Sequence, residues 1–152
     1  MSRRDQIRMT PEEVDAYLHE PHLCRIGTMN PDGTIHLVAM NYGFVDGLPA
    51  FWTYRRAQKT LNLERNPTIS MIVDTGYKYS ELKGVSLVGT GTVRTDEAAM
   101  ETYLASIRER YGGGPRGTTG KAASASAPKR AVVTIAVEKV ISWDHAKLGG
   151  GY

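Results

Sequence analysis

A cluster of basic side chains at the start of a predicted helix is the part of the sequence best suited to chemistry. Residues 51–54 are rich in aromatic side chains and predict a strand, and residues 57–66 predict a short helix. The first acidic residue in this stretch is Glu64. The basic and hydroxyl side chains that precede it are Arg55, Arg56, Lys59 and Thr60.

These cations are unfavourably placed for a bare helix. A helix N-terminus carries roughly +0.5 charge, so each cation there costs about 0.3–1 kcal/mol unless an anion lies nearby. The free backbone N–H groups at the same place favour phosphate. The pattern therefore predicts a phosphate-binding site, with a solvated basic turn as the alternative.

The remaining reactive side chains form no recognisable metal or nucleophile set. Cys24 lies among apolar residues with Arg25 as its one basic neighbour, which predicts a buried, unreactive thiol. No nucleophilic serine elbow or Gly-rich phosphate loop is present. We expect no metal site, because no metal-ligand spacing on one element joins the histidines His19, His22, His36 and His145.

An anion site beside aromatic residues, without a catalytic side-chain set, is typical of a protein whose bound cofactor carries the chemistry. Tyr54, Tyr79 and His145 are each chemically able to deliver a proton. Their spacing does not choose between them and solvent. No catalytic residue is therefore assigned from the sequence.

The elements that must position these residues follow from hydrophobic period, caps and turns. Helices are expected over 11–18, where Thr10 and Glu13 form a capping box with Pro11 at the first position, over 57–66, and over 97–111 after Asp96. A Gly-, Ser- and Ala-rich segment, 112–128, is expected to be a mobile loop, and 143–152 a C-terminal tail. Strands are expected over 23–29, 34–42, 50–54, 69–74, 85–95 and 130–142.

Six strands joined mostly by hairpins predict a mainly β fold. An antiparallel sheet of this size would leave exposed edges unless it closed, so we expect a six-stranded antiparallel barrel with short peripheral helices. With 152 residues, of which 41% are apolar, the chain fits a single domain over 1–152.

The composition also indicates the cellular compartment and the classes of binding partner to expect. A single cysteine suits a reducing compartment, and no apolar signal core or membrane-length apolar stretch is present, so a cytoplasmic protein without membrane contact is expected. A net charge of +3 is mild and the basic residues are mostly dispersed, which does not favour nucleic-acid binding.

Three motifs resemble the pyridoxamine 5'-phosphate oxidase-like superfamily, the FMN-binding split β-barrels. These are Phe51-Trp52-Thr53 with Gln58-Lys59 and Asn66-Pro67, then Leu82-Lys83-Gly84-Val85 before Gly89, and the closing Ser142-Trp143-Asp144-His145-Ala146-Lys147-Leu148-Gly149. The last motif, together with 36–42, is similar to the flavin/deazaflavin oxidoreductase B branch that binds coenzyme F-420, an 8-hydroxy-5-deazaflavin. The resemblance covers nearly the whole chain.

The resemblance implies a homodimer with a cofactor in each of two grooves at the subunit interface. It implies that the ring and ribityl side is lined by Val38, Ala39, Met40 and Asn41. It implies that Gly84 and Val85 come from the other subunit, and Trp143 with them. The phosphate end would be held by Trp52, Thr53, Tyr54, Arg55, Lys59 and Thr60.

The sequence also departs from the vitamin B6 oxidase of this superfamily. That enzyme has an arginine and a lysine where Leu37 and Tyr42 stand, and a flavin-contacting glutamine where Gly84 stands. The cation set is larger than one phosphate requires, which favours F-420, with its anionic tail, over FMN.

The expected activity is hydride transfer from reduced F-420 to an electron-poor small-molecule acceptor. The alternatives are an FMN-dependent oxidase or reductase and a non-catalytic cofactor-binding protein. The physiological substrate is not readable from the sequence.

Overall fold

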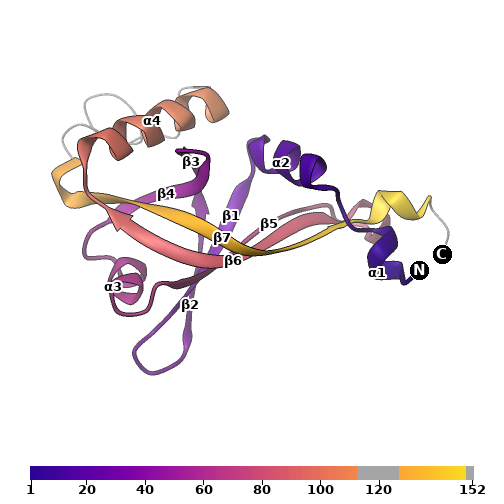
Figure 1. Ribbon diagram of the computed structural model, residues 1–152, viewed down its shortest axis with the longest axis horizontal. Helices are drawn as coiled ribbons and strands as arrows, with labels where there is room; N and C mark the ends of the chain where they lie inside the picture. Colours follow the sequence, from indigo (N-terminus) through magenta and orange to yellow (C-terminus); the bar gives the residue numbers. More distant parts are fainter. Residues whose placement is uncertain (113–126, 150–152) are drawn as a thin grey trace.

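The structure, a computed structural model, describes residues 1–112 and 127–149. In these residues one antiparallel sheet has the strand order β2-β1-β5-β6-β7-β4-β3 and curls through the whole molecule (Figure 1). No hydrogen-bonded ladder joins β2 to β3 in the described part, so the barrel is open between them. The strands are β1 Leu23–Met29, β2 Ile35–Asn41, β3 Gly43–Val45, β4 Leu48–Tyr54, β5 Thr68–Thr75, β6 Lys83–Arg94 and β7 Arg130–Asp144.

Short helices lie around the sheet. Thr10 and Glu13 form the expected capping box of α2, and Asp96 accepts from the Ala99 N–H to begin α4. α4 ends at Gly112, whose φ of 65° is a conformation that glycine adopts without strain. The helices are α1 Arg3–Gln6, α2 Pro11–His19, α3 Gln58–Arg65 and α4 Glu97–Tyr111, with 3-10 turns η1 Tyr79–Glu81, η2 Ala127–Lys129 and η3 His145–Leu148.

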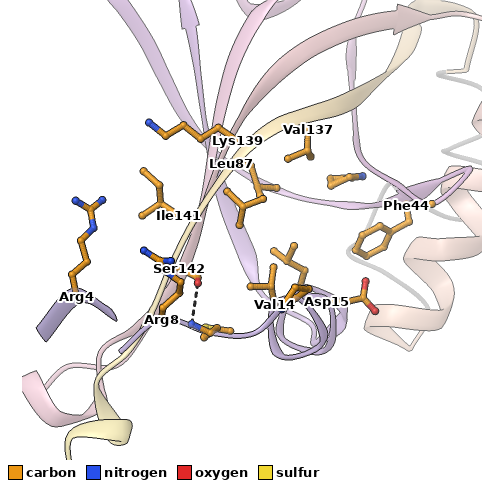
Figure 2. Close-up of a pocket in the computed structure, with 16 residues that line it drawn as sticks. Arg4, Arg8, Val14, Asp15, Phe44, Leu87, Val137, Lys139, Ile141 and Ser142 are labelled. Atoms are coloured by element: carbon orange, nitrogen blue, oxygen red, sulfur yellow. Dashed lines mark hydrogen bonds between the residues drawn. The ribbon is translucent and has the colours of Figure 1, made fainter. Parts of the chain in front are cut away.

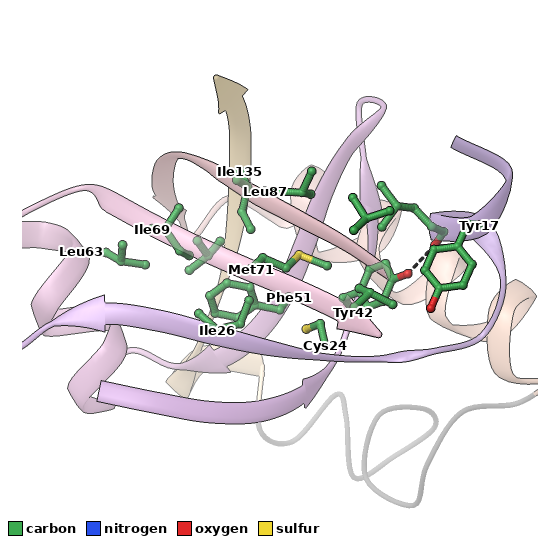
Figure 3. Packing of buried hydrophobic residues seen from close by; sticks show 14 of the residues in the cluster. Tyr17, Cys24, Ile26, Tyr42, Phe51, Leu63, Ile69, Met71, Leu87 and Ile135 are labelled. Carbon is green, nitrogen blue, oxygen red and sulfur yellow. Dashed lines mark hydrogen bonds between the residues drawn. The ribbon is translucent and has the colours of Figure 1, made fainter. Parts of the chain in front are cut away.

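Two apolar clusters hold these elements together. The larger lies inside the curl of the sheet, where Ile26, Phe51 and Leu87 pack with side chains from α2 and α3 (Figure 3). The smaller lies between α4 and the strands β3, β4 and β7, and it includes Trp52 and Tyr103. Because β4 alternates its side chains between the two clusters, its position is fixed from both faces.

The predicted class is confirmed: the fold is mainly β, antiparallel and barrel-like, with short helices. The strand count of six was wrong by one, because residues 43–45 form a separate strand, β3, that pairs with β4 across the turn at Asp46 and Gly47. The α4 bounds were predicted correctly. Most of the expected mobile loop at 112–128, and the last residues of the expected tail at 143–152, lie outside the described residues.

Candidate functional site

The residues of the predicted anion site come together where β4 passes into α3. The helix begins after Ala57, which has no side chain able to cap it, and its first turn contains no acidic residue. Thr60 is fully buried and its hydroxyl donates to the Tyr54 carbonyl at 2.7 Å, which locks the helix start against the end of the strand. The backbone N–H groups of Gln58 and Lys59 have no acceptor among the described residues.

Arg130 brings a further cation to this place. β4 and β7 are paired so that Tyr54 lies opposite Arg130. The Arg130 guanidinium lies over the Tyr54 ring, 3.6 Å from its centroid, and 5.0 Å from the Trp52 centroid. Arg55 is tied to the same residue, since its Nε donates to the Arg130 carbonyl at 3.0 Å.

The electrostatics of this cluster are unbalanced. Burial lowers the pKa of Lys59, and the positive charge of Arg130 lowers it further. In the described residues no carboxylate lies within ion-pair distance of Arg55, Arg56, Lys59 or Arg130. Cations brought together with free backbone donors and no counter-ion fit a phosphate group.

The other predicted binding residues occupy two further places. On β2, Val38 and Met40 pack against the larger apolar cluster, while Ala39 is exposed and Asn41 is half-buried. Gly84 and Trp143 are direct partners across β6 and β7. A methyl group on Gly84 would lie 2.2 Å from the Trp143 ring, so the space beside Gly84 is filled by this indole.

Several predicted residues have side chains directed into the protein. Trp52, Thr53 and Val85 are buried, so within one chain their side chains support the site rather than line an open groove. The chain brings Trp52, Tyr54, Arg55, Lys59 and Thr60 together, and brings Gly84 and Val85 to Trp143. β2, which carries 38–41, lies at the other end of the strand order from β4 and β3.

Sequence reasoning missed Arg130 as a site residue. Its only sequence signal was its place at the start of a predicted strand, because the pairing of β4 with β7 joins residues far apart in the chain. The pairing could be found only from the fold.

The comparisons with known proteins place the fold. The sequence profile described as pyridoxamine 5'-phosphate oxidase matches residues 10–144. The chain belongs to the pyridoxamine 5'-phosphate oxidase family. No curated protein matches the sequence closely enough to count as a relative.

Solved structures of other proteins share this fold. Conserved hypothetical protein Rv2991 from Mycobacterium tuberculosis is 30% identical with a TM-score of 0.86, over 100% of this chain and 95% of its own. An F-420 reductase is 20% identical with a TM-score of 0.67, over 86% and 98%. HutZ, a heme storage protein from Vibrio cholerae, is 14% identical with a TM-score of 0.66, over 90% and 96%.

The C-terminal motif acts as a clamp on the N-terminal segment; we use the term C-terminal clamp for residues 142–148. The Ser142 hydroxyl accepts from the Met9 N–H at 3.1 Å, and Asp144 pairs with Lys83 at 3.1 Å. Lys147 donates to the Arg8 carbonyl and pairs with Glu13 at 2.5 Å. Each charged group of Asp144 and Lys147 therefore has a partner inside the chain.

The proton-donor candidates lie in two separate places. Tyr54 is half-exposed at the cation cluster, whereas His145 is buried in the C-terminal clamp with the Tyr79 ring 4.3 Å from its own. Cys24 is buried as predicted, and burial raises the pKa of its thiol to about 12. In the described residues no group of His, Cys, Asp and Glu side chains could hold a metal ion.

A groove of about 820 Å³ lies between α2 and β7. Leu87, Val137 and Ile141 line it together with Val14 of α2, and Arg4, Arg8 and Lys139 stand at its rim (Figure 2). None of the predicted site residues lines this groove. The groove is therefore separate from the predicted cofactor site.

None of the helices in the described residues is long and apolar enough to cross a membrane.

Proposed function

We propose that this member of the pyridoxamine 5'-phosphate oxidase family is a cytoplasmic, homodimeric oxidoreductase that uses coenzyme F-420. The observation that carries the proposal is the cation cluster at the start of α3, which has no counter-ion among the described residues. Its charge exceeds what a single phosphate requires, and an F-420 tail supplies further carboxylates.

The chain's own residues would hold and orient the cofactor. Lys59, Arg55 and the free N–H groups of α3 would bind the phosphate end. The β2 residues from Val38 to Asn41, of which Ala39 is exposed and the others are half-buried, would line the ring and ribityl side, where apolar contact excludes water. Hydride transfer to an electron-poor, conjugated acceptor is the chemistry that the reduced cofactor supplies when bound.

A second copy of the chain would complete the groove. The β2 residues and the β4–α3 residues lie at opposite ends of the strand order, and Gly84 with Trp143 forms a third place. Apolar side chains remain exposed on several strands, including Ile35 and Leu37 at 68% each on β2 and Val140 at 48% on β7. These exposed side chains support the proposed dimer.

An FMN-dependent oxidase or reductase is the alternative activity, because FMN carries the same kind of phosphate group. A non-catalytic cofactor-binding protein is the other alternative. The HutZ neighbour shows that this fold also serves proteins named for ligand storage. Both alternatives keep the location of the phosphate site.

Fluorescence titrations of the purified protein with F-420 and with FMN, each at low and high salt, test the proposal. We expect F-420 to bind more tightly than FMN. The difference in affinity should become smaller at high salt, because charges at the surface are screened over about 8–10 Å at physiological ionic strength and the contacts to the F-420 tail lie there. Tighter FMN binding at both salt levels would favour the flavin alternative. Light scattering on the same samples measures the dimer, and a cofactor-loaded monomer at micromolar concentration would contradict it.

A further inference from the structure

The guanidinium of Arg130 has donors that no described residue accepts. Its Nε is buried and has no hydrogen-bond partner. No ion pair or side-chain hydrogen bond of Arg130 is formed with the described residues. A buried donor without an acceptor destabilises the fold, so such a group calls for an explanation.

The stacking of Arg130 explains its position but not its donors. The central carbon of the guanidinium lies 3.6 Å from the centroid of the Tyr54 ring, which is a stacking distance. Its N–H bonds lie in the guanidinium plane, so stacking covers the face of the group and leaves the edge free to donate. Trp52 approaches the same guanidinium and is itself held by Tyr103 of α4, with ring centroids 6.2 Å apart.

Two further cations belong to the same cluster. Lys59 is near enough for Arg130 to lower its pKa, and Arg55 donates to the Arg130 carbonyl. A fold that places an arginine and a half-buried lysine in the same cluster gains nothing from the pair itself, because like charges repel. An anion between them reverses the sign of the interaction.

We propose that Arg130 is a phosphate ligand of the cofactor site, and that Tyr54 and Trp52 position it by stacking. This inference rests on the proposed function for the identity of the cofactor. It adds a recognition element that takes two oxygens of one phosphate through the guanidinium edge, which the single ammonium of Lys59 cannot do. Arg130 would thereby favour phosphorylated cofactors over their phosphate-free forms.

The test compares cofactors with and without phosphate. Dissociation constants for FMN and riboflavin, and for F-420 and the deazaflavin nucleoside that lacks its phosphate, are measured by fluorescence in the wild type and in Arg130→Gln, Arg130→Lys and Arg108→Gln. Arg108 is an exposed arginine of α4 and serves as the matched control.

We expect Arg130→Gln to reduce the preference for the phosphorylated form by about 10- to 100-fold, the range of a charge-assisted hydrogen bond, with the phosphate-free affinity unchanged. Arg130→Lys should restore only part of the preference. Tyr54→Leu should reduce it by a smaller factor, and Tyr54→Phe should keep it because the stacking ring remains. An unchanged preference in Arg130→Gln, or equal losses for both forms, would overturn the inference.

A second measurement separates this inference from the proposed function. The Arg130 Nε–H resonance, identified by its loss in Arg130→Lys, is followed while inorganic phosphate is added, with sodium chloride at matched ionic strength as the control. A phosphate-specific shift supports the inference even if neither F-420 nor FMN binds, which would contradict only the proposed function. No phosphate-specific shift would overturn the inference even if a cofactor binds.

Discussion

The start of α3 and the C-terminal clamp differ in whether their charged side chains form ion pairs. In the C-terminal clamp, Asp144 pairs with Lys83 and Lys147 pairs with Glu13. At the start of α3, Lys59 and Arg130 are close enough to interact electrostatically, and neither pairs with a carboxylate from the described residues. Both regions carry motifs of the family, so the motifs alone do not separate them.

The difference distinguishes a structural motif from a binding motif. Paired charges are satisfied by the fold and join the N-terminal segment to the end of β7. Cations and N–H groups that have no partner among the described residues are neutralised and hydrogen-bonded only when an anionic ligand binds. The pairing of the charges, rather than the residue types, supports the proposal that the start of α3 binds a ligand.

The largest expected effect is on cofactor binding at the start of α3. Lys59→Ala should weaken the binding of the phosphorylated cofactor by about 1.5–3 kcal/mol, because it removes a charge-assisted contact. Lys147→Ala, from the C-terminal clamp, should leave the affinity unchanged, as should the surface control Arg108→Ala. Fluorescence titration measures all three. Equal losses in the three variants would mean that the effect is general electrostatics.

A smaller effect is expected on stability at the contact between Gly84 and Trp143. Gly84→Ala should lower the free energy of unfolding by about 1–3 kcal/mol, since the added methyl group would overlap the indole. In a Trp143→Ala background the same substitution should cost little, because the overlapping ring is absent. Urea denaturation of the two single variants and the double variant gives the coupling. Additive losses would contradict this packing.

The stability of the cofactor-free protein should depend on pH through Lys59, whose pKa is lowered. The pKa of Lys59 in the folded protein lies below its usual value of 10.5. Between these two pH values the Lys59 amine is more often protonated in the unfolded chain than in the folded protein. The stability contributed by this site therefore rises as pH increases through that interval. Lys59→Met should be more stable than the wild type at neutral pH, with a difference that shrinks toward pH 10.5. Denaturant titrations at several pH values measure it, and a constant difference would be contrary to expectation.

The smallest expected effect concerns the ion pair between Lys147 and Glu13. The hydrogen bond from Lys147 lowers the pKa of Glu13 from its usual value of 4.5. The stability that the pair contributes is present above pH 4.5 and is lost as pH falls through the lowered folded-state pKa. Lys147→Ala should move the Glu13 pKa back toward 4.5 in an NMR titration. Lys139→Ala, on the rim of the groove, provides the control and should leave it unmoved.

Much of the fold was readable from local signals. Thr10, Asp96 and the turn at Asp46 and Gly47 act through neighbouring backbone groups, so their roles follow from short stretches of sequence. β3 escaped notice because three residues are too few to show a period. The cation cluster at the start of α3 was also predicted from local sequence.

Long-range features could not be predicted in the same way. Arg130 reaches the cluster only through the pairing of β4 with β7, and Gly84 meets Trp143 only through the pairing of β6 with β7. The hydroxyl of Thr60 was expected near a phosphate, and the structure shows that it donates to the Tyr54 carbonyl. Whether it also contacts a cofactor stays a prediction.

The burial of Cys24 has a practical consequence for spectroscopy. It is the one cysteine of the sequence, it is fully buried, and its thiol pKa is about 12, so maleimide reagents should leave the native protein unlabelled. A cysteine introduced by Arg108→Cys on the exposed face of α4 would then accept a single spin label per chain. Dipolar distances between two such labels would report directly how two copies of the chain are arranged in solution.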